Sequence, residues 1–419
     1  MSIHDPRQVI EDIRNHLASH DRHLAFLLGA GTSSAVNIAP APPPGGKPAH
    51  EPLIPGIEGL TELCRASVCG MGNTQAAAWD SLVTQCKEEG GAANVENVLS
   101  KVRRKIDALG DGETLLNLDR DQLSRIENAI GTEIAKAVSP ADDKIPKSMP
   151  RDEFAAWVKR ANRTAPLEIF TTNYDILLER SFELARVPVF DGFVGTHRPF
   201  FYPECLDDDD LLPRSKWIRL WKLHGSVNWR LEHECNASIA DKRIVRTQVN
   251  QGGELILPSH RKYDESRKQP YVAYMDRLSR LLNSDHALLI ACGYSFRDDH
   301  INAVLYGALD SRKTANIVAL QFSDLKEDDG VAKVAARHSN LTVIGPNAGI
   351  ISGRWGLWQL IRPVENKTAS FMDLAFDSNA SLEDQVSPAA ASDNLRGRMR
   401  LGDFNYFCRF LNAMGIDIQ

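Results

Sequence analysis

Short apolar runs alternate with amphipathic stretches on both sides of a long helical middle. Near the start, apolar residues recur every three or four positions over residues 6–20, which predicts a helix with one buried face. An apolar run over 23–28 then predicts a strand, which leads into a glycine-containing turn at 29–34. Helix, strand and turn in this order are typical of the opening unit of a Rossmann-like domain.

Further strands of the buried type follow in the second half of the chain. The segments 167–171 and 218–223 are short and largely apolar, and 286–293 is continuously apolar in the manner of a central parallel strand. Two more candidate strands lie at 316–321 and 341–344. Because helical patterns separate several of these strands, the sequence predicts an α/β fold built on a Rossmann-like parallel sheet.

The middle of the chain carries a helical pattern almost without interruption. Leu123, Ile126, Ile130 and Ile134 recur at three and four positions, and no strand signal of any length appears. This pattern predicts a helical module inserted after the first strand. The predicted organisation is the first part of a Rossmann-like domain at 1–56, a helical insertion at 57–160, the remainder of that domain at 161–364, and a linker with a C-terminal helix at 365–419.

The C-terminal segment contains two different patterns. Residues 365–398 lose periodicity and are filled with Ser, Asn, Asp and Ala, which predicts a flexible linker. Phe404, Phe407 and Phe410 then form the apolar face of a short amphipathic helix. This helix could pack on the body of the protein or dock on a neighbouring chain, and the pattern leaves both open.

Composition and charge narrow the class of protein. Hydrophobic residues make up 43% and charged residues 25% of the 419 residues, as in soluble globular proteins. The chain has 49 Lys and Arg against 55 Asp and Glu, and a net charge of −6 argues against a protein that coats nucleic acid by bulk charge, although it leaves a local basic patch open. We expect no direct nucleic-acid binding. The charged N-terminus is no signal peptide, and no apolar run approaches the ~20 residues that cross a bilayer. We therefore expect a cytoplasmic protein without membrane contact.

The seven cysteines are odd in number and scattered along the chain, and none forms a C-x-x-C pair. This distribution predicts neither a disulfide framework nor a zinc ribbon, and it fits a reducing compartment. We expect no bound zinc.

The first predicted strand ends in the turn Gly29-Ala30-Gly31-Thr32-Ser33. Glycines allow a tight turn, and the N–H groups of a following helix can face a phosphate. The third glycine of the dinucleotide-binding pattern is replaced by Ser34, so an ordinary strand-to-helix turn is the alternative. The proline- and glycine-rich stretch 37–56 is either a surface linker or a mobile loop that closes over a bound nucleotide.

Three later strands also end in polar turns. The strand at 167–171 is followed by Thr172, Asn173 and Asp175, although Asn173 and Asp175 could simply cap and begin the next helix. His224 ends the strand at 218–223 and is either a satisfied core residue or a base that faces a cleft. The third turn contains Gly293 and Ser295. In a parallel sheet all these strand ends emerge at one edge and form one cleft.

In these four turns the sequence resembles the sirtuin family. The family signature is a Gly-Ala-Gly turn with a following Ser, a Thr-Gln-Asn-x-Asp motif, a catalytic His-Gly and a late Gly-Thr-Ser. Here the corresponding residues are Gly29 to Ser33, Thr171 to Asp175, His224-Gly225 and Gly293 to Ser295. The resemblance covers about 23–34 and 165–345, and it implies a Rossmann-like fold that binds NAD+.

Departures from the signature favour one branch of the family. Protein deacylases carry a zinc ribbon after the His-Gly, which is missing here, and Thr-Tyr replaces Gln-Ile in the asparagine motif. These features resemble the bacterial defence-associated branch, whose members hydrolyse NAD+ to starve a phage-infected cell. The resemblance implies an NAD+ glycohydrolase that releases nicotinamide and ADP-ribose, with NAD+ as substrate.

The implied site has distinct roles for its residues. Asn173 and His224 are the catalytic pair, and Asp175 is a candidate to orient the ribose or the carboxamide. The turn Gly29 to Ser33 would hold the pyrophosphate, and Gly293 and Ser295 would hold the ribose on the adenosine side. Thr172 completes the predicted NAD+-binding set.

The resemblance also implies a setting for the protein. Stand-alone members of the defence branch are often encoded with a HerA-type ring ATPase, so we expect a homo-oligomer and a partner of that kind. Two other functions stay open: an NAD+ or ADP-ribose sensor without turnover, and an NAD-dependent protein deacylase.

Overall fold

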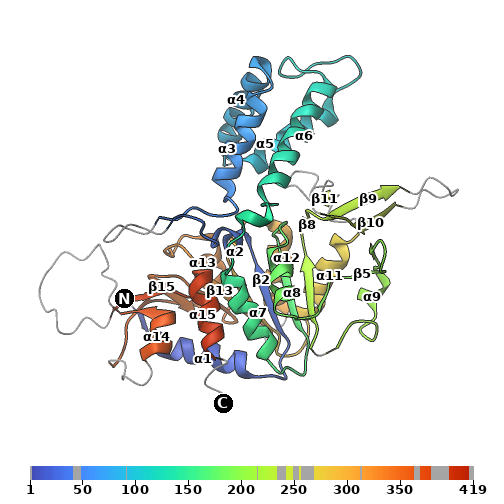
Figure 1. Ribbon diagram of the computed structural model, residues 1–419. Coiled ribbons are helices and arrows are strands. Elements are labelled where there is room, and N and C mark those ends of the chain that lie inside the picture. Colours follow the sequence, from blue (N-terminus) through green and yellow to red (C-terminus); the bar gives the residue numbers. More distant parts are fainter. Residues whose placement is uncertain are drawn as a thin grey trace, which may run out of the picture.

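A computed structural model describes residues 2–40, 49–90, 92–214, 216–233, 242–248, 254–255, 269–311, 314–362, 369–378 and 396–414. Its centre is a ten-stranded sheet in the order β1-β16-β15-β14-β13-β12-β2-β3-β7-β4 (Figure 1). The strands are β1 (Ile3–His4), β2 (Leu24–Leu28), β3 (Leu167–Thr171), β4 (Val189–Phe190), β7 (Ile218–Lys222), β12 (Leu288–Cys292), β13 (Asn316–Leu320), β14 (Leu341–Ile344), β15 (Ala348–Ile351) and β16 (Arg354–Trp358).

The seven strands from β14 to β4 all run parallel. Six of them follow the order β7-β3-β2-β12-β13-β14, which is the doubly wound Rossmann order with its reversal between β2 and β12. β2, β3, β7 and β12 are buried along their whole length, as expected for parallel strands covered on both faces. The predicted α/β class and Rossmann-like sheet are confirmed.

The central strands end level with one another. Leu28 of β2 pairs with both Cys292 of β12 and Thr171 of β3, and Thr171 pairs in turn with Lys222 of β7. The turns that follow these four strands therefore begin at the same height on one edge of the sheet. The predicted convergence of four polar strand ends is present in the fold.

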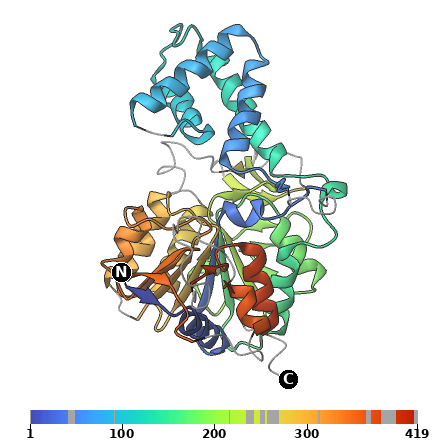
Figure 2. The same cartoon turned by 90° about the vertical axis from the view of Figure 1, so that its left-hand side faces the viewer.

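Helices cover both faces of the sheet. One face carries α1 (Pro6–Ala18), α7 (Pro150–Arg160), α8 (Leu177–Leu184), α14 (Ala369–Ala375) and α15 (Phe404–Met414). The other carries α11 (Tyr271–Leu282), α12 (Asp299–Ser311) and α13 (Gly330–Ala335). Figure 2 shows α15, in red, beside the green helices on one side of the sheet. The aromatic phenylalanines of α15 lie in the core of that face, so the C-terminal helix packs on the body of the protein.

A helical module projects beyond the edge at which the central strands end (Figures 1 and 2). It consists of α3 (Ile57–Cys69), α4 (Asn73–Glu88), α5 (Val95–Ala108) and α6 (Arg120–Ala137), which share an apolar core of their own. Asn94 caps α5, and Asp119 and Gln122 form a capping box at the start of α6. The predicted insertion is thus a four-helix module over 57–137.

The last helix within the range predicted for the insertion, 57–160, packs elsewhere. Phe154 and Trp157 of α7 contact Phe26 of β2 edge to face, with ring centroids 5.2 and 5.9 Å apart. α7 therefore belongs to the core beneath the sheet. Its helical periodicity is the same as that of the insertion, so the sequence pattern could not separate them.

Smaller elements surround the main sheet. They are the four-stranded sheet β5 (Phe193–Val194), β6 (Phe200–Phe201), β10 (Lys242–Arg246) and β9 (Trp229–His233), the pair β8 (Gly225–Ser226) and β11 (Glu254–Leu255), the pair β17 (Phe376–Asp377) and β18 (Arg398–Met399), and the short helices α2 (Ala30–Ser34), α9 (Glu204–Asp207) and η1 (Asp142–Lys144). Of the predicted linker 365–398, residues 365–368 and 379–395 lie outside the described residues, as does 41–48 of the stretch 37–56. The linker prediction is wrong for 369–377, which form α14 and β17 and pack on the body of the protein through Met372, Ala375 and Phe376. No helix within the described ranges is long and apolar enough to cross a membrane.

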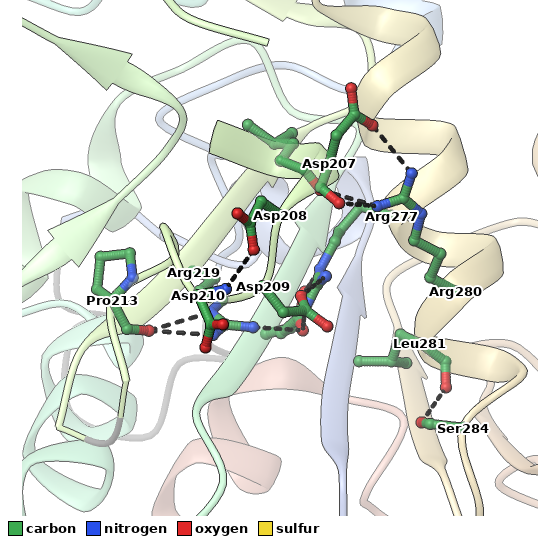
Figure 3. A network of polar contacts seen from close by, with 12 residues as sticks. Asp207, Asp208, Asp209, Asp210, Pro213, Arg219, Arg277, Arg280, Leu281 and Ser284 are labelled. Atoms are coloured by element: carbon green, nitrogen blue, oxygen red, sulfur yellow. Dashed lines mark hydrogen bonds and ion pairs between the residues drawn. The ribbon is translucent and has the colours of Figure 1, made fainter. Parts of the chain in front are cut away.

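A buried charge cluster ties α11 to β3 and β7. Glu168 of β3 accepts hydrogen bonds from Arg277 at 2.8 and 3.0 Å and from the Trp221 indole at 2.7 Å. Arg277 also reaches Asp209, and Arg280 binds Asp207 at 2.9 Å (Figure 3). A buried carboxylate with this many donors is fully compensated, so the cluster fixes α11 against the sheet.

Candidate active site

The two glycine turns at the reversal of the sheet pack directly against each other. Gly29 N–H donates to the Cys292 carbonyl and Gly31 N–H donates to the Gly293 carbonyl, each at 3.0 Å. A Cβ atom on Gly29 would lie 2.3 Å from the Gly293 oxygen, and one on Gly31 would lie 2.8 Å from the Gly293 Cα. These glycines are therefore required by the contact between the two turns. Ala30 and Gly31 are the exposed part of the first turn.

The Ser33 hydroxyl is the centre of a buried hydrogen-bond network. It donates its single proton to Asp175 Oδ2 at 2.6 Å. It accepts from the Asn173 amide nitrogen Nδ2 at 2.8 Å and from Arg151 Nη2 at 2.9 Å. Ser33, Asp175 and Arg151 are 3%, 5% and 2% exposed, so the hydroxyl bridges a buried cation and a buried carboxylate.

This network fixes the orientation of the Asn173 side chain. The Thr32 hydroxyl donates to the Gly29 carbonyl at 2.8 Å, so it can only accept from Asn173 Nδ2, which lies 3.0 Å away. Ser33 is likewise limited to accepting. Both hydroxyls therefore face the NH2 end of the amide, and the carbonyl oxygen Oδ1 points away from them. No described residue donates a hydrogen bond to that oxygen.

His224 stands at the end of the neighbouring strand and is held by a carboxylate. Its Nε2 lies 2.9 Å from Asp298 Oδ2, and both side chains are mostly buried. The second oxygen of Asp298 accepts from the backbone N–H groups of His300 and Ile301 at the start of α12. The carboxylate therefore has a fixed position, and the imidazole is oriented through it.

Asn173 and His224 occupy matching places on adjacent strands. Each lies two residues beyond the paired residues Thr171 and Lys222, and neighbouring parallel strands are about 4.8 Å apart. The Tyr174 ring lies beside the imidazole, with centroids 6.3 Å apart. The structure thus places the two predicted catalytic residues at the ends of neighbouring strands on one edge of the sheet.

The predicted NAD+-binding residues Thr172, Asp175 and Ser295 differ in how far they are buried and in the hydrogen bonds they make. Asp175 is engaged within the protein, because its Oδ1 accepts from Leu177 N–H at 3.0 Å and its Oδ2 from Ser33. Thr172 is half-buried and its N–H donates to the Leu28 carbonyl at 3.2 Å. Ser295 is exposed beyond Gly293 on the β12 side of the edge.

Three side chains of the site were missed in the sequence. Asp298 lies 74 residues beyond His224, and its only signal was its position before a helix, where Asp is a common cap. Arg151 belongs to α7, and nothing in a helical pattern shows that it reaches Ser33. Lys222, whose Nζ lies 2.8 Å from Glu179 and also donates to the Asp175 carbonyl at 2.5 Å, reads as part of a strand.

The helical module stands close enough to act on this edge electrostatically. Burial raises the pKa of the Tyr174 hydroxyl well above its usual range, and the charge of Glu96 on α5 adds to the rise. In Figure 1 the module lies above the ends of the central strands. Within the described part of the chain, no group of three or more His, Cys, Asp or Glu side chains is arranged to hold a metal ion.

Residues 167–344 match the model of the SIR2-like domain family. The match runs from β3 to β14 and contains Asn173, His224 and Asp298, whereas β2 and the helical module lie outside it. SIR2-like domains are generally NAD-dependent enzymes, so the match supports NAD+ as the ligand of this region. A search of curated proteins finds no match to the chain.

Proposed function

We propose that this protein is an NAD+ glycohydrolase, which uses water to release nicotinamide and leaves ADP-ribose. The observation that carries the proposal is the position of Asn173 and His224 at the ends of the adjacent strands β3 and β7, next to the switch point between β2 and β12 of a Rossmann sheet. In open α/β sheets ligands bind at this point, beside the turn after the first strand. That turn is the one that contains Gly29 and Gly31.

The chemistry asks for little more than a placed water and a proton acceptor. In NAD+ the nicotinamide ring itself carries a positive charge. When its bond to the ribose breaks, it departs as a neutral molecule with the bond electrons, so positive charge develops on the ribose. Asn173 Oδ1 can accept a proton of the attacking water in a hydrogen bond, which leaves an oxygen lone pair for C1′. The water oxygen then forms the new bond to C1′.

His224 would take the proton that this water loses. An Asp298 carboxylate accepts from Nε2–H, so in the neutral ring Nδ1 carries the lone pair and serves as the base. Asp298 also stabilises the imidazolium once the proton has moved. A ribose hydroxyl held at the same place could transfer its proton to His224 in the same way.

The direct test follows free nicotinamide when the purified full-length chain is incubated with NAD+. His224→Ala should lower the rate roughly 100-fold or more, because a general base contributes about 10²–10⁴. Asn173→Ala should lower it by about 100-fold, because the attacking water loses the group that positions it. Circular dichroism should show an unchanged fold. His20→Ala, an exposed histidine away from this edge, is the matched control and should retain the wild-type rate.

Other outcomes identify the competing functions. Thermal stabilisation by NAD+ or ADP-ribose without nicotinamide release would contradict the glycohydrolase and assign a sensor. Nicotinamide release that requires an acylated peptide would assign a deacylase instead.

We propose further that the activity serves antiphage defence by depleting cellular NAD+. The support is the resemblance to the defence-associated branch, which also suggests a homo-oligomer and a HerA-type ring ATPase as partner. Cells that carry the wild-type chain with its neighbouring genes should lose NAD+ after infection, and cells with Asn173→Ala should not. Light scattering of the purified chain, alone and with the ATPase, tests both kinds of assembly.

A further inference from the structure

A groove lies at the amino-terminal edge of the parallel strands, opposite the edge that carries Asn173 and His224. Its cavity volume is about 420 Å³, within the roughly 300–1,000 Å³ of small-molecule sites. The end of α7, the starts of β3 and β7 and the turn after α8 form its walls. We call it the basal groove and define it by Lys159, Arg160, Arg163, Arg186, Lys216 and Trp217.

The basal groove carries positive charge without a matching negative charge. Five of its lining residues are Lys or Arg, and none is Asp or Glu. Among the described residues, no carboxylate oxygen lies within 4.0 Å of any of these five cationic groups. The chain as a whole has a net charge of −6, so this local excess favours an anionic ligand.

Helix ends account for three of the cations. Lys159 and Arg160 lie in the last turn of α7, where positive charge complements the helix dipole. Arg160 also donates to the Asn412 carbonyl at 3.0 Å, which ties α15 to α7. Arg163 donates to the Leu17 carbonyl in the last turn of α1. Only Arg186 and Lys216 need another explanation.

Arg186 and Lys216 adopt backbone conformations that are unfavourable for residues with a Cβ atom. Their φ angles are 56° and 78°, in the left-handed region that glycine adopts most readily. Arg186 follows α8 at the position where Val187 N–H bonds the Phe182 carbonyl and Arg186 N–H bonds the Glu183 carbonyl. This is the pairing of a Schellman cap, whose left-handed residue is usually glycine. An arginine there points to a role for its side chain.

Arg163 places a fixed positive charge at the base of the groove. It is 8% exposed and donates to the backbone carbonyls of Leu17, Ser19 and Arg22. Its Nε is buried and has no hydrogen-bond partner among the described residues. Burial lowers the pKa of Arg163, and nearby Asp21 opposes that shift only in part. An anion in the groove would compensate this buried charge.

Trp217 supplies a flat apolar surface beside the cations. Its side chain is 43% exposed, whereas Trp79, Trp221, Trp229 and Trp358 are at most 1% exposed. Pro166 and Pro188 add apolar wall on the same groove. Nucleobases stack on exposed aromatic rings, and phosphates bind Lys and Arg.

We propose that the basal groove binds a free nucleotide, with the base stacked on Trp217 and the phosphate held by Lys216 and Arg186. The combination of a flat ring, several cations and a cavity of this size matches one nucleotide better than a bare anion or an extended polymer. The site does not depend on the proposed NAD+ hydrolysis, because it lies at the other edge of the sheet.

Calorimetric titration of the full-length chain with AMP tests the proposal. Trp217→Ala and Lys216→Glu should each weaken AMP binding at least tenfold, and Trp217→Phe, which keeps a stacking ring, should stay close to wild type. Lys326→Glu makes the same charge change at an exposed lysine outside the groove and should bind AMP normally. Circular dichroism of each variant excludes unfolding as the cause.

Two results would overturn the proposal. One is AMP affinity that the groove substitutions leave unchanged, because the nucleotide would then bind elsewhere, for instance at the Asn173 edge. The other is binding of a ten-nucleotide single-stranded oligonucleotide with no binding of AMP, because the groove would then recognise a strand.

Discussion

The Ser33 hydroxyl, which has one proton to donate and two acceptor positions, fixes the orientation of the Asn173 side-chain amide. Ser33 gives its proton to Asp175 and accepts from Asn173 and Arg151. An interchange of Nδ2 and Oδ1 in Asn173 would place two acceptors opposite each other, so the amide has one stable orientation. The site is therefore preorganised by groups that need not touch the substrate.

Ser33→Ala should disturb both stability and turnover. Arg151 and Asn173 would lose an acceptor in a buried place, which costs about 1–3 kcal/mol in the free energy of unfolding. The released amide would position water poorly, so kcat should fall about tenfold or more. Ser34→Ala, whose hydroxyl bonds the Ala30 carbonyl within the same turn, is the control and should affect both quantities little. Equal stability of wild type and Ser33→Ala would contradict the role of the hydroxyl.

Asp298→Asn tests the positioning of the imidazole. The amide oxygen can still cap α12, but its NH2 group, turned to Nε2, would favour the tautomer with the proton on Nδ1. The rate of nicotinamide release should fall about 100-fold with KM nearly unchanged. The imidazolium also loses a neighbouring negative charge, so the acidic limb of the rate profile should move to lower pH. Asp299→Asn, on an exposed side chain one residue later, should keep the wild-type profile.

Two features of the sequence single out Asn173 and His224. Both follow strands that would end at one edge of a parallel sheet, and both stand in motifs that resemble the sirtuin signature, which implies their catalytic role. The sequence does not single out Asp298, since the pattern of a helix cap does not reveal which way the second carboxylate oxygen points. Arg151 was hidden for another reason. Its helix has the same apolar period as the insertion, and only the packing of Phe154 on Phe26 shows that α7 lies under the sheet.

The contact between the two glycine turns joins β2 and β12 at the switch point. Gly293 has a φ of 65°, and a Cβ atom there would lie 2.6 Å from the Thr32 nitrogen. The turns must approach this closely for Gly31 N–H to reach the Gly293 carbonyl. Glycines are also typical of phosphate-binding turns, but here the close contact between the two turns already requires Gly31 and Gly293.

Gly293→Ala should therefore destabilise the protein by about 1–3 kcal/mol, through left-handed backbone strain and the clash with Thr32. Gly307→Ala is the matched control, because Gly307 lies within α12 and a Cβ atom there meets nothing within 4 Å. That control should be stabilising by about 0.5–1 kcal/mol, since alanine favours a helix interior. Chemical denaturation measures both, and a Gly293→Ala variant as stable as wild type would show that the turns can separate.

The molecule combines one sheet domain, covered by α15 from the far end of the chain, with a helical module that has its own core. Cys64 of α3 and Ile130 of α6 are joined inside that core by a sulfur–carbonyl contact of 3.8 Å. The module meets the rest of the protein near the edge that carries the proposed site, where α5 acts on Tyr174. Two cores of this kind predict two folding units joined at a functional surface.

Replacing residues 57–137 with a short Gly-Ser linker between Gly56 and Val138 tests this organisation. The shortened chain should unfold cooperatively, because the core on both faces of the sheet is retained. Since burial and the charge of Glu96 raise the pKa of Tyr174, removing α5 should lower that pKa toward the ordinary value of about 10. Ultraviolet titration, with Tyr174→Phe as the reference that lacks this hydroxyl, would report the change. If the shortened chain aggregates while the isolated segment 55–139 lacks helical circular dichroism, the two cores depend on each other and the division into units is wrong.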